Sequence, residues 1–342
     1  MRRFERERRA PAHYRAPCIR LAAWVALLAL GAPMPAPAWG GKVKLKRRYH
    51  SGQTMVYASK MHTKVEIHSD PPGLARLLPP MPTDFTLQQQ NTMTVKTVHD
   101  DGSADVENRF DKFEFQSNFA DRLPENLRDP AVEAQQEISS NIAGQNLVAH
   151  YDRKGQLLRF EGGEGLFEQF DVAHRETLRQ VVGFFLQQME GDALFPDHPV
   201  KPGETWKHKL DAQPNAMDLN NAGSENTLRY IGKTKVGGVK AAIVEFSFLN
   251  TLTPSLNDQR KTGPLALLES QGMGMDVHIN GQGKGRVLVA LDDGRILQNH
   301  ASVRQTMSAT LKSPASGAAK DAQTLKFEIQ SDTDMDIDGS SR

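Results

Sequence analysis

Apolar and polar residues alternate along most of the chain, and this period of two constrains the fold more than any other feature. Over residues 55–67 apolar side chains recur at odd positions, whereas Lys60, Lys64 and Glu66 fall between them. Similar alternation occurs over residues 85–95, 106–115, 242–248, 273–279, 287–291, 297–311 and 325–329. Side chains of a strand point alternately to its two faces, so the pattern predicts antiparallel strands with one buried face.

Turn sequences separate these segments. DDGS at 100–103, DRKGQ at 152–156, KVGGVK at 235–240 and LDDGRI at 291–296 predict tight hairpins. The alternation slips by one residue near Asp111, which predicts a β-bulge.

Two central segments follow a helical period instead. Asp129-Pro130 offers a cap and a first-turn proline, and it precedes a stripe of Ala131, Ala134, Ile138 and Ile142. A second stripe extends from about Glu164 to Glu190 and ends at Gly191. We therefore expect two helices within an otherwise all-strand chain.

The chain also contains a weak internal duplication. Residues 91–115 resemble residues 226–250, and residues 147–162 resemble residues 287–302. We expect a first β-rich half with two helices at 39–190 and a second β-rich half at 191–342, both in the same sheet.

Residues 1–38 have the parts of a secretory signal peptide. A basic region precedes an uncharged apolar run at 21–31, which is short for a membrane-spanning helix. An uncleaved anchor is the alternative, but small residues and prolines follow the run. Ala36 and Ala38 form the cleavage pattern, so the mature chain would begin at Trp39, without a transmembrane span, in the periplasm or outside the cell.

Composition excludes some functions. The single cysteine, Cys18, lies in the leader, so the mature chain would form no disulfide and no thiolate metal site. Without the leader, 35 basic and 39 acidic residues remain, a formal net charge of −4. This balance argues against nucleic acid as a partner.

A basic run, Lys42 to Arg48, opens the mature chain and alternates with Val43, Leu45 and Tyr49. It fits the solvated face of a first strand. Contact with anionic lipid head groups is the alternative.

The stretch FPDHPVKPGETW at 195–206, with YDRKGQLLRFEGGEG at 151–165, resembles an uncharacterised family of secreted bacterial proteins, a domain of unknown function. The shared pattern also includes Ser51–Tyr57 and Val98–Gly102, so the resemblance covers most of the mature chain. It implies no activity. It implies an architecture similar to lipoprotein-carrier half-barrels: one large curved antiparallel sheet with two central helices packing on the concave face.

Two helices about 10 Å wide would cover only part of a sheet of about ten strands. The rest of the concave face must pack on loops, curl on itself or hold a ligand. The loop at 70–83 is unusually apolar and would either cover that face or complete the core. The candidate ligand-binding residues are Leu74, Leu77, Leu78 and Met81 of this loop, together with Met55, Met93 and Met275.

The sequence contains no G-x-S-x-G nucleophile elbow and no H-E-x-x-H zinc-binding helix. The stretch GQGKGR at 281–286 does not have the spacing of a phosphate-binding loop, and we expect it at the start of a strand. His62 and His68 share a strand face but form no three-ligand cluster. Asp334, Asp336 and Asp338 match half of a calcium loop and fit a final strand better. We expect no enzyme activity, no cofactor and no metal.

The sequence therefore predicts an exported, non-enzymatic protein that binds or carries a hydrophobic ligand on its concave face. A lipid, an acyl chain or a lipidated protein would fit. The alternative is a structural or protein-interaction domain of the cell envelope without a small ligand.

Overall fold

The computed structural model describes residues 41–70, 82–164, 195–210, 223–252, 274–312 and 324–341. These residues contain eleven strands, one α-helix and one short 3-10 helix. The strands are β1 (Thr54–Asp70), β2 (Asp84–Val98), β3 (Ala104–Ser117), β4 (Asn146–Tyr151), β5 (Leu157–Gly162), β6 (Thr205–Leu210), β7 (Gly223–Val236), β8 (Val239–Leu252), β9 (Gly274–Ala290), β10 (Ile296–Lys312) and β11 (Thr324–Ser341). The helices are η2 (Ala120–Arg122) and α2 (Glu125–Ile142).

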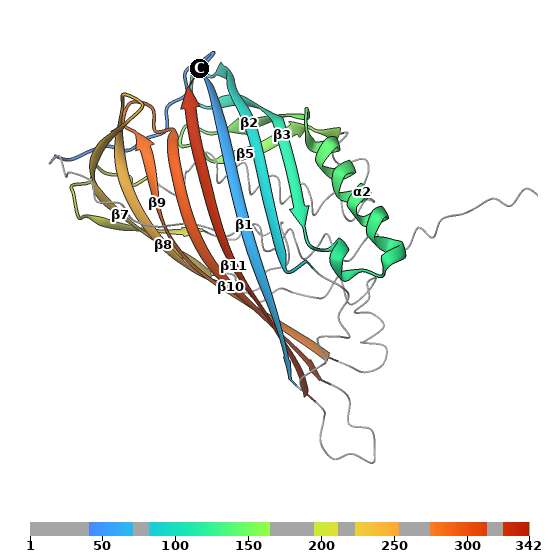
Figure 1. Ribbon diagram of the computed structural model, residues 1–342. Helices are drawn as coiled ribbons and strands as arrows, with labels where there is room; N and C mark the ends of the chain where they lie inside the picture. The colour runs from blue at the N-terminus through green and yellow to red at the C-terminus, as the bar shows by residue number, and fades with distance from the viewer. Residues whose placement is uncertain are drawn as a thin grey trace, which may run out of the picture.

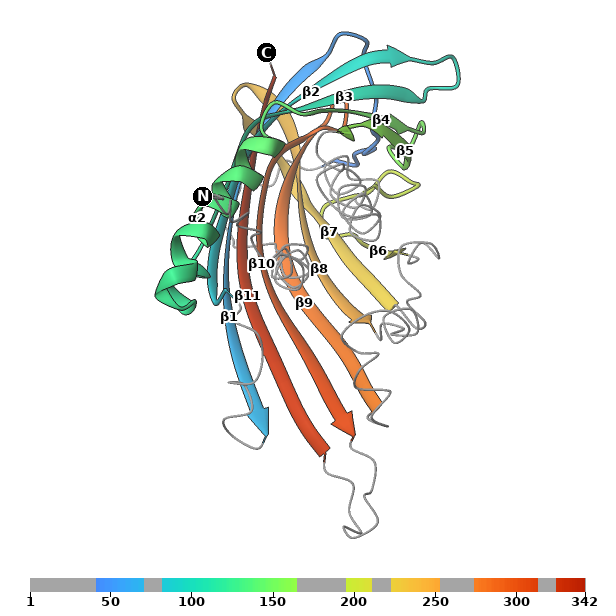
Figure 2. The same cartoon turned by 90° about the vertical axis from the view of Figure 1, so that its right-hand side faces the viewer.

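All eleven strands form one antiparallel sheet in the order β5-β4-β3-β2-β1-β11-β10-β9-β8-β7-β6. The chain starts in the middle with β1 and moves outward to β5. It then continues from the opposite edge with β6 and returns to β11, which pairs with β1. Figures 1 and 2 show that this sheet is strongly curved, and that β1 and β9–β11 extend furthest from residues 41–50, which precede β1. The predicted single curved antiparallel sheet is confirmed.

The local expectations for turns and the bulge are also confirmed. The four predicted hairpin turns connect β2 to β3, β4 to β5, β7 to β8 and β9 to β10. Their glycines, Gly102, Gly155, Gly238 and Gly294, all have positive φ. The register between β2 and β3 shifts at Gln90/Asn91, opposite Asp111.

Helix α2 corrects the expectation that two helices pack on the concave face. It begins at Glu125, four residues before the expected cap, so that Pro130 lies inside it. None of its residues is fully buried, and it runs beside β3, where β4 no longer pairs (Figure 1). There Ser139 and Gln135 accept hydrogen bonds from the backbone N–H groups of Phe115 and Ser117, at 3.2 and 3.1 Å. The helix thus protects an open strand edge.

Three other expectations lie outside the described residues. They are the signal peptide with its cleavage residues Ala36, Ala38 and Trp39, most of the second helix at 164–190, and the loop residues Leu74, Leu77, Leu78 and Met81. They stay predictions.

We call the face of the sheet that carries Met55, Tyr57, Met61 and Val65 of β1 the inner face, because these side chains are buried. The opposite, outer face carries Lys60 and Lys64 on the same strand. Residues of other strands are assigned to a face by their pairing with β1 through the sheet register. The expected final strand is confirmed, because Asp334, Asp336 and Asp338 all lie on the outer face of β11.

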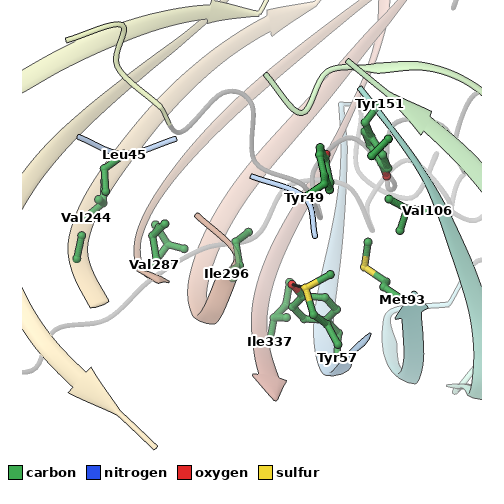
Figure 3. Packing of buried hydrophobic residues seen from close by; sticks show 14 of the residues in the cluster. Leu45, Tyr49, Tyr57, Met93, Val106, Tyr151, Val244, Val287, Ile296 and Ile337 are labelled. Carbon is green, nitrogen blue, oxygen red and sulfur yellow. Dashed lines mark hydrogen bonds between the residues drawn. The ribbon is translucent and has the colours of Figure 1, made fainter. Parts of the chain in front are cut away.

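Residues 41–50, which we call the strap, cross the inner face at one end of the sheet. Val43 exchanges two 2.8 Å backbone hydrogen bonds with Val200, just before β6. Leu45 lies near Val244 of β8 in Figure 3. Tyr49 stacks on Tyr151 of β4, with ring centroids 6.1 Å apart. The strap therefore connects the two outer parts of the sheet over its main hydrophobic core (Figure 3).

Candidate functional site

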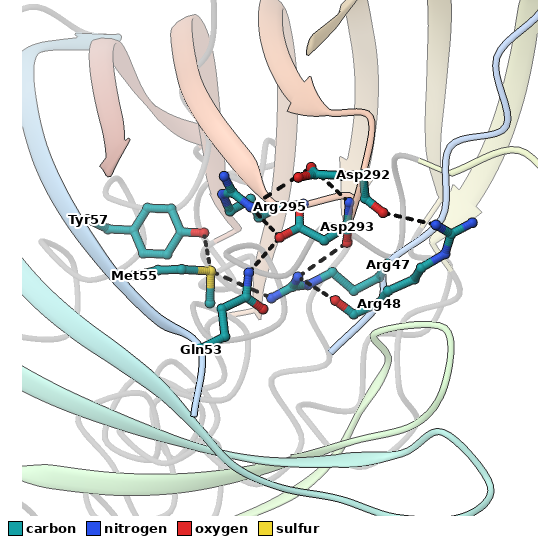
Figure 4. A network of polar contacts seen from close by, with 8 residues as sticks. All are labelled: Arg47, Arg48, Gln53, Met55, Tyr57, Asp292, Asp293 and Arg295. Carbon is teal, nitrogen blue, oxygen red and sulfur yellow. Dashed lines mark hydrogen bonds and ion pairs between the residues drawn. The ribbon is translucent and has the colours of Figure 1, made fainter. Parts of the chain in front are cut away.

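A buried polar network fixes the strap to the turn between β9 and β10 (Figure 4). Arg48 N–H donates to the Asp293 carbonyl at 2.8 Å, and Arg47 Nη1 donates to the same oxygen at 3.4 Å. The side chain of Arg47 is only 2% exposed and lies 4.5 Å from the centroid of the Tyr49 ring. A Cβ on Gly294, whose φ is +74°, would lie 2.4 Å from the Lys46 carbonyl oxygen, so the turn contacts the strap directly.

Asp293 is the charged centre of this network. Its carboxylate accepts hydrogen bonds from Gln53 Nε2 at 2.5 Å, from the Arg295 guanidinium, and from the Arg295 backbone N–H at 3.1 Å. Burial by itself would raise the pKa of Asp293, but the hydrogen bonds from Arg295 and Gln53 outweigh it and hold the pKa below its usual value. The carboxylate therefore stays ionised, and the network serves structure at the strap end.

Beyond the strap the inner face carries further apolar clusters, with buried polar side chains such as Thr63 and Gln305 between them. A separate cluster combines β1, β2 and β11. Its buried members are Met61, Val65, Phe85 and Ile329, and the half-buried Ile67, Leu87, Phe115 and Met307 pack against them. Helix α2 contributes no buried residue. These side chains form the first half of what we call the far apolar face.

The second half of the far apolar face lies on β8 and β10. Phe248, Ala301 and Val303 are buried together there, with Phe246 against them. Between these strands, β9 presents Gly283, where an added Cβ would lie 2.5 Å from the Phe248 ring and 2.6 Å from Val303 Cγ2. Gly283 therefore permits the Phe248 ring to lie across the strand. The GQGKGR stretch lies within β9, so its expected position at a strand entry was wrong.

Three asparagines lie on the inner face. Asn91 and Asn299 lie at the border between the main core and the far apolar face, and Asn108 lies one residue pair closer to the strap, within the main core. Asn91 of β2 pairs with Tyr57 and Phe110, and Asn108 of β3 pairs with Met93 and Leu147. On β10, Asn299 pairs with Ile337 and Val287. We call Asn91, Asn108 and Asn299 the amide belt.

The amide belt is poorly satisfied within the part of the chain that the structure describes. Asn91 and Asn108 are each 1% exposed. Both side-chain polar atoms of Asn91, Oδ1 of Asn108 and Oδ1 of Asn299 are buried without a hydrogen-bond partner. Asn108 Nδ2 donates to the Val106 carbonyl at 3.3 Å. Since buried polar groups are nearly always hydrogen-bonded, these atoms require an explanation.

The structure separates the sequence-predicted ligand residues. Met55 and Met93, 1% and 0% exposed, lie in the main core at the strap end, not on the far apolar face. The Met55 sulfur accepts weak hydrogen bonds from Tyr57 Oη at 3.5 Å and Arg47 Nη2 at 3.8 Å. Met275 lies in β9, at the end distant from the strap, and its side chain is not among those described. Alternation gave these residues the correct face but carries no information about which end the strap covers.

A scan against protein-family models finds no match, and a search of the curated proteins finds no similar sequence. Among solved structures, the outer membrane protein OprG from Pseudomonas aeruginosa aligns over 87% of this chain and 99% of its own. Its identity is 7% and its TM-score 0.21. OccK11 (OpdR) of the same species aligns over 90% of this chain and 100% of its own, with 7% identity and a TM-score of 0.17. Alignments with such low TM-scores transfer neither fold nor function.

The outer face is charged and paired. Arg304 of β10 donates to both carboxylate oxygens of Asp332 of β11, at 2.7 and 3.2 Å, and His300 contacts Asp336. Of the acidic residues that resembled a calcium loop, Asp336 thus faces His300, and Asp338 accepts a hydrogen bond from Gln298 Nε2 at 3.0 Å. Within the described ranges, no three His, Cys, Asp or Glu side chains are grouped so as to hold a metal ion. No helix in those ranges has the length and apolarity to cross a membrane.

Sequence reasoning missed the buried polar groups. Arg47 was expected with the basic run on a solvated strand face, although it shares its parity with Val43, Leu45 and Tyr49 and is buried with them. Asp293 was read only as a turn residue, because its partners come from distant parts of the chain. Asn91 lies in the polar run QQQNT, whose odd positions point inward, and Asn108 directly opposes Met93. Parity was the available signal for Arg47, Asn91 and Asn108, whereas Asp293 lies in a turn and offered none.

Proposed function

We propose that the protein is an exported, non-enzymatic binding protein that holds an apolar molecule against the far apolar face. A lipid, an acyl chain or a lipidated protein segment fits this face. The observation that carries the proposal is the division of the inner face. The strap fills one end with its own residues, while apolar side chains continue along β1, β2, β8, β10 and β11 beyond it.

The proposal agrees with the physical character of the face. Burial of apolar area stabilises association by about 25 cal/mol per Å², so several aligned apolar strands can retain an acyl chain. Met61 and Met307 add side chains that adapt to ligands of different shape. The leader, if cleaved as expected, would bring this binding surface into the cell envelope.

One observation favours the alternative of an interaction domain that binds no small ligand. The side chains of Met61, Val65, Phe85 and Ile329 are only 2–7% exposed. If the protein's own chain covers the face permanently, no lipid enters.

Lipid analysis of the purified protein separates the two functions. The chain is exported into a Gram-negative periplasm with its leader, purified without detergent and extracted for lipid mass spectrometry beside a mock preparation. A stoichiometric lipid supports the carrier. Clean protein that also fails to bind a fluorescent fatty-acid probe supports the interaction domain.

A pair of variants on one strand locates the binding surface. Met307→Gln adds a polar group to the inner face of β10, and Thr306→Gln is the matched change on the outer face. Probe affinity should fall with Met307→Gln alone. Equal affinities in a lipid-binding protein would place the ligand elsewhere.

A further inference from the structure

The amide belt adjoins the far apolar face, and its unsatisfied atoms define a chemical requirement. Of the four buried atoms of the amide belt that have no partner among the described residues, three are carbonyl oxygens, on Asn91, Asn108 and Asn299. Only one is an amide nitrogen, Nδ2 of Asn91. The orientation of Asn108 follows from its Nδ2 donating to the Val106 carbonyl. The belt therefore offers mainly acceptors.

A complementary partner must supply hydrogen-bond donors and must not be an anion. A carboxylate or phosphate presents only acceptors and would face the three oxygens unfavourably. An uncharged head with hydroxyl or amide N–H groups would donate to the oxygens and could accept from Asn91 Nδ2. Its apolar tail would pass the intervening Gln89 to reach Leu87 and Met61, which lie on the same face further from the strap.

We propose that the amide belt is the head-group site of the bound apolar molecule, and that it selects lipids with an uncharged, hydrogen-bond-donating head over free fatty acids. This inference rests on the proposed function. It adds the ligand class: an acyl chain with a hydroxyl or amide head.

The effect of replacing these asparagines on stability distinguishes a ligand site from a purely structural role. An asparagine kept for structure would lose hydrogen bonds on replacement, and the protein would be destabilised. An asparagine kept for a ligand costs stability in the ligand-free protein, since it is buried without a partner. Replacing it with leucine, which is similar in volume, should therefore leave the ligand-free protein as stable or more stable while the lipid preference is lost.

The test compares three probes with one acyl chain: a monoacylglycerol, its methyl ester analogue and the free fatty acid. Delipidated wild-type protein should bind the monoacylglycerol about tenfold more tightly than the methyl ester, which corresponds to one or two net hydrogen bonds. The free fatty acid should bind no better than the ester. Asn91→Leu and Asn108→Leu should remove the preference but retain ester binding.

Thr63→Val is the matched control, because Thr63 is buried on the same face and bonds Thr333 Oγ1 at 2.9 Å. This change should lower the melting temperature and keep the lipid preference. Acyl binding without head-group preference, or destabilisation by both asparagine variants to the extent seen with Thr63→Val, overturns the head-group site alone. Absence of binding by all three probes overturns the proposed function as well.

Discussion

The two ends of the inner face have the same sequence pattern and different partners. At the strap end, Val43, Leu45 and Tyr49 fill the space between the two outer parts of the sheet, and Asp293 fixes them through a buried network. At the other end, the far apolar face continues the alternation, and α2 lies beside β3 with no fully buried residue. Alternation therefore determines which face of a strand is apolar, but not what covers that face.

This difference separates residues that stabilise the protein from residues that we expect to bind. Residues of the strap and of its polar network should affect the free energy of unfolding strongly and lipid binding weakly. Residues of the far apolar face should affect lipid binding more strongly than residues of the strap do.

The largest effect is expected from Asp293→Ala. The change leaves the Arg295 guanidinium buried without its closest carboxylate and removes the acceptor of Gln53. Breaking a buried ion pair on one side costs about 3–5 kcal/mol, measured as the free energy of unfolding in urea. Asp292→Ala is the control, because the Asp292 side chain is 67% exposed. Equal losses for both would show that the network does not fix the strap.

Leu45→Ala should cost about 2–4 kcal/mol of unfolding free energy, since it opens a cavity between the strap and the main core. The neighbouring Lys44→Ala, on the exposed side of the strap, should change stability by less than about 0.5 kcal/mol. Both variants should retain the lipid affinity of the wild type. If Leu45→Ala alone lowers the lipid affinity, the ligand binds at the strap end, and the proposed division between the two ends is wrong.

At the far apolar face, Gly283→Ala should cost about 1–3 kcal/mol, because the new methyl group would meet the Phe248 ring and Val303. Lys284→Ala on the outer face of the same strand is the control. A double variant with Phe248→Ala should lose less than the sum of the two single changes, because the smaller side chain makes room. Additive losses would exclude direct contact between Gly283 and Phe248.

The pH dependence of stability should come from both halves of the sheet. The pKa of Glu245 is lowered mainly by a hydrogen bond from Arg229, against burial and with help from Arg286, and the pKa of Asp293 is lowered as described above. A folded-state pKa below the unfolded value adds stability above the unfolded pKa of about 4, and this stability is lost as the pH falls through the folded value. The free energy of unfolding, measured by urea denaturation, should thus be nearly constant from about pH 5 to 7 and fall below about pH 4. Asp293→Asn should reduce this loss of stability at acid pH. If the loss is unchanged in the variant, other carboxylates cause it.

Much of the sheet could be predicted because its information is local. The alternation gave the strands, the glycine turns gave the hairpins, and the slip near Asp111 gave the bulge. The position of α2 could not be predicted in this way. Its stripe is half-buried as expected, but the choice between the concave face and the edge of β3 depends on where β4 stops pairing.

The candidate site was less predictable, for a related reason. Arg47, Asn91 and Asn108 have the parity of buried residues, but a polar side chain at such a position is the exception that binary patterning discards. Asp293 and the strap lie far apart in sequence, so that only the folded sheet brings them together. Places where local rules fail in this manner are often functional or strained, which is why the amide belt is the residue set to examine first.

The smallest effect on the free energy of unfolding is expected for residues of the outer face, which belong to neither end of the inner face. Arg304 and Asp332 form a two-pronged ion pair between β10 and β11, with side chains 55% and 49% exposed. Exposed pairs of this kind contribute at most about 1 kcal/mol, so Arg304→Gln should lower the free energy of unfolding only slightly, and less at high salt. Lipid affinity should be unchanged, because the pair lies on the opposite side of the sheet from Val303 and Gln305. A loss comparable to that of Leu45→Ala would mean that the outer face stabilises the sheet as much as the strap does, and the division between the two ends would no longer explain where stability resides.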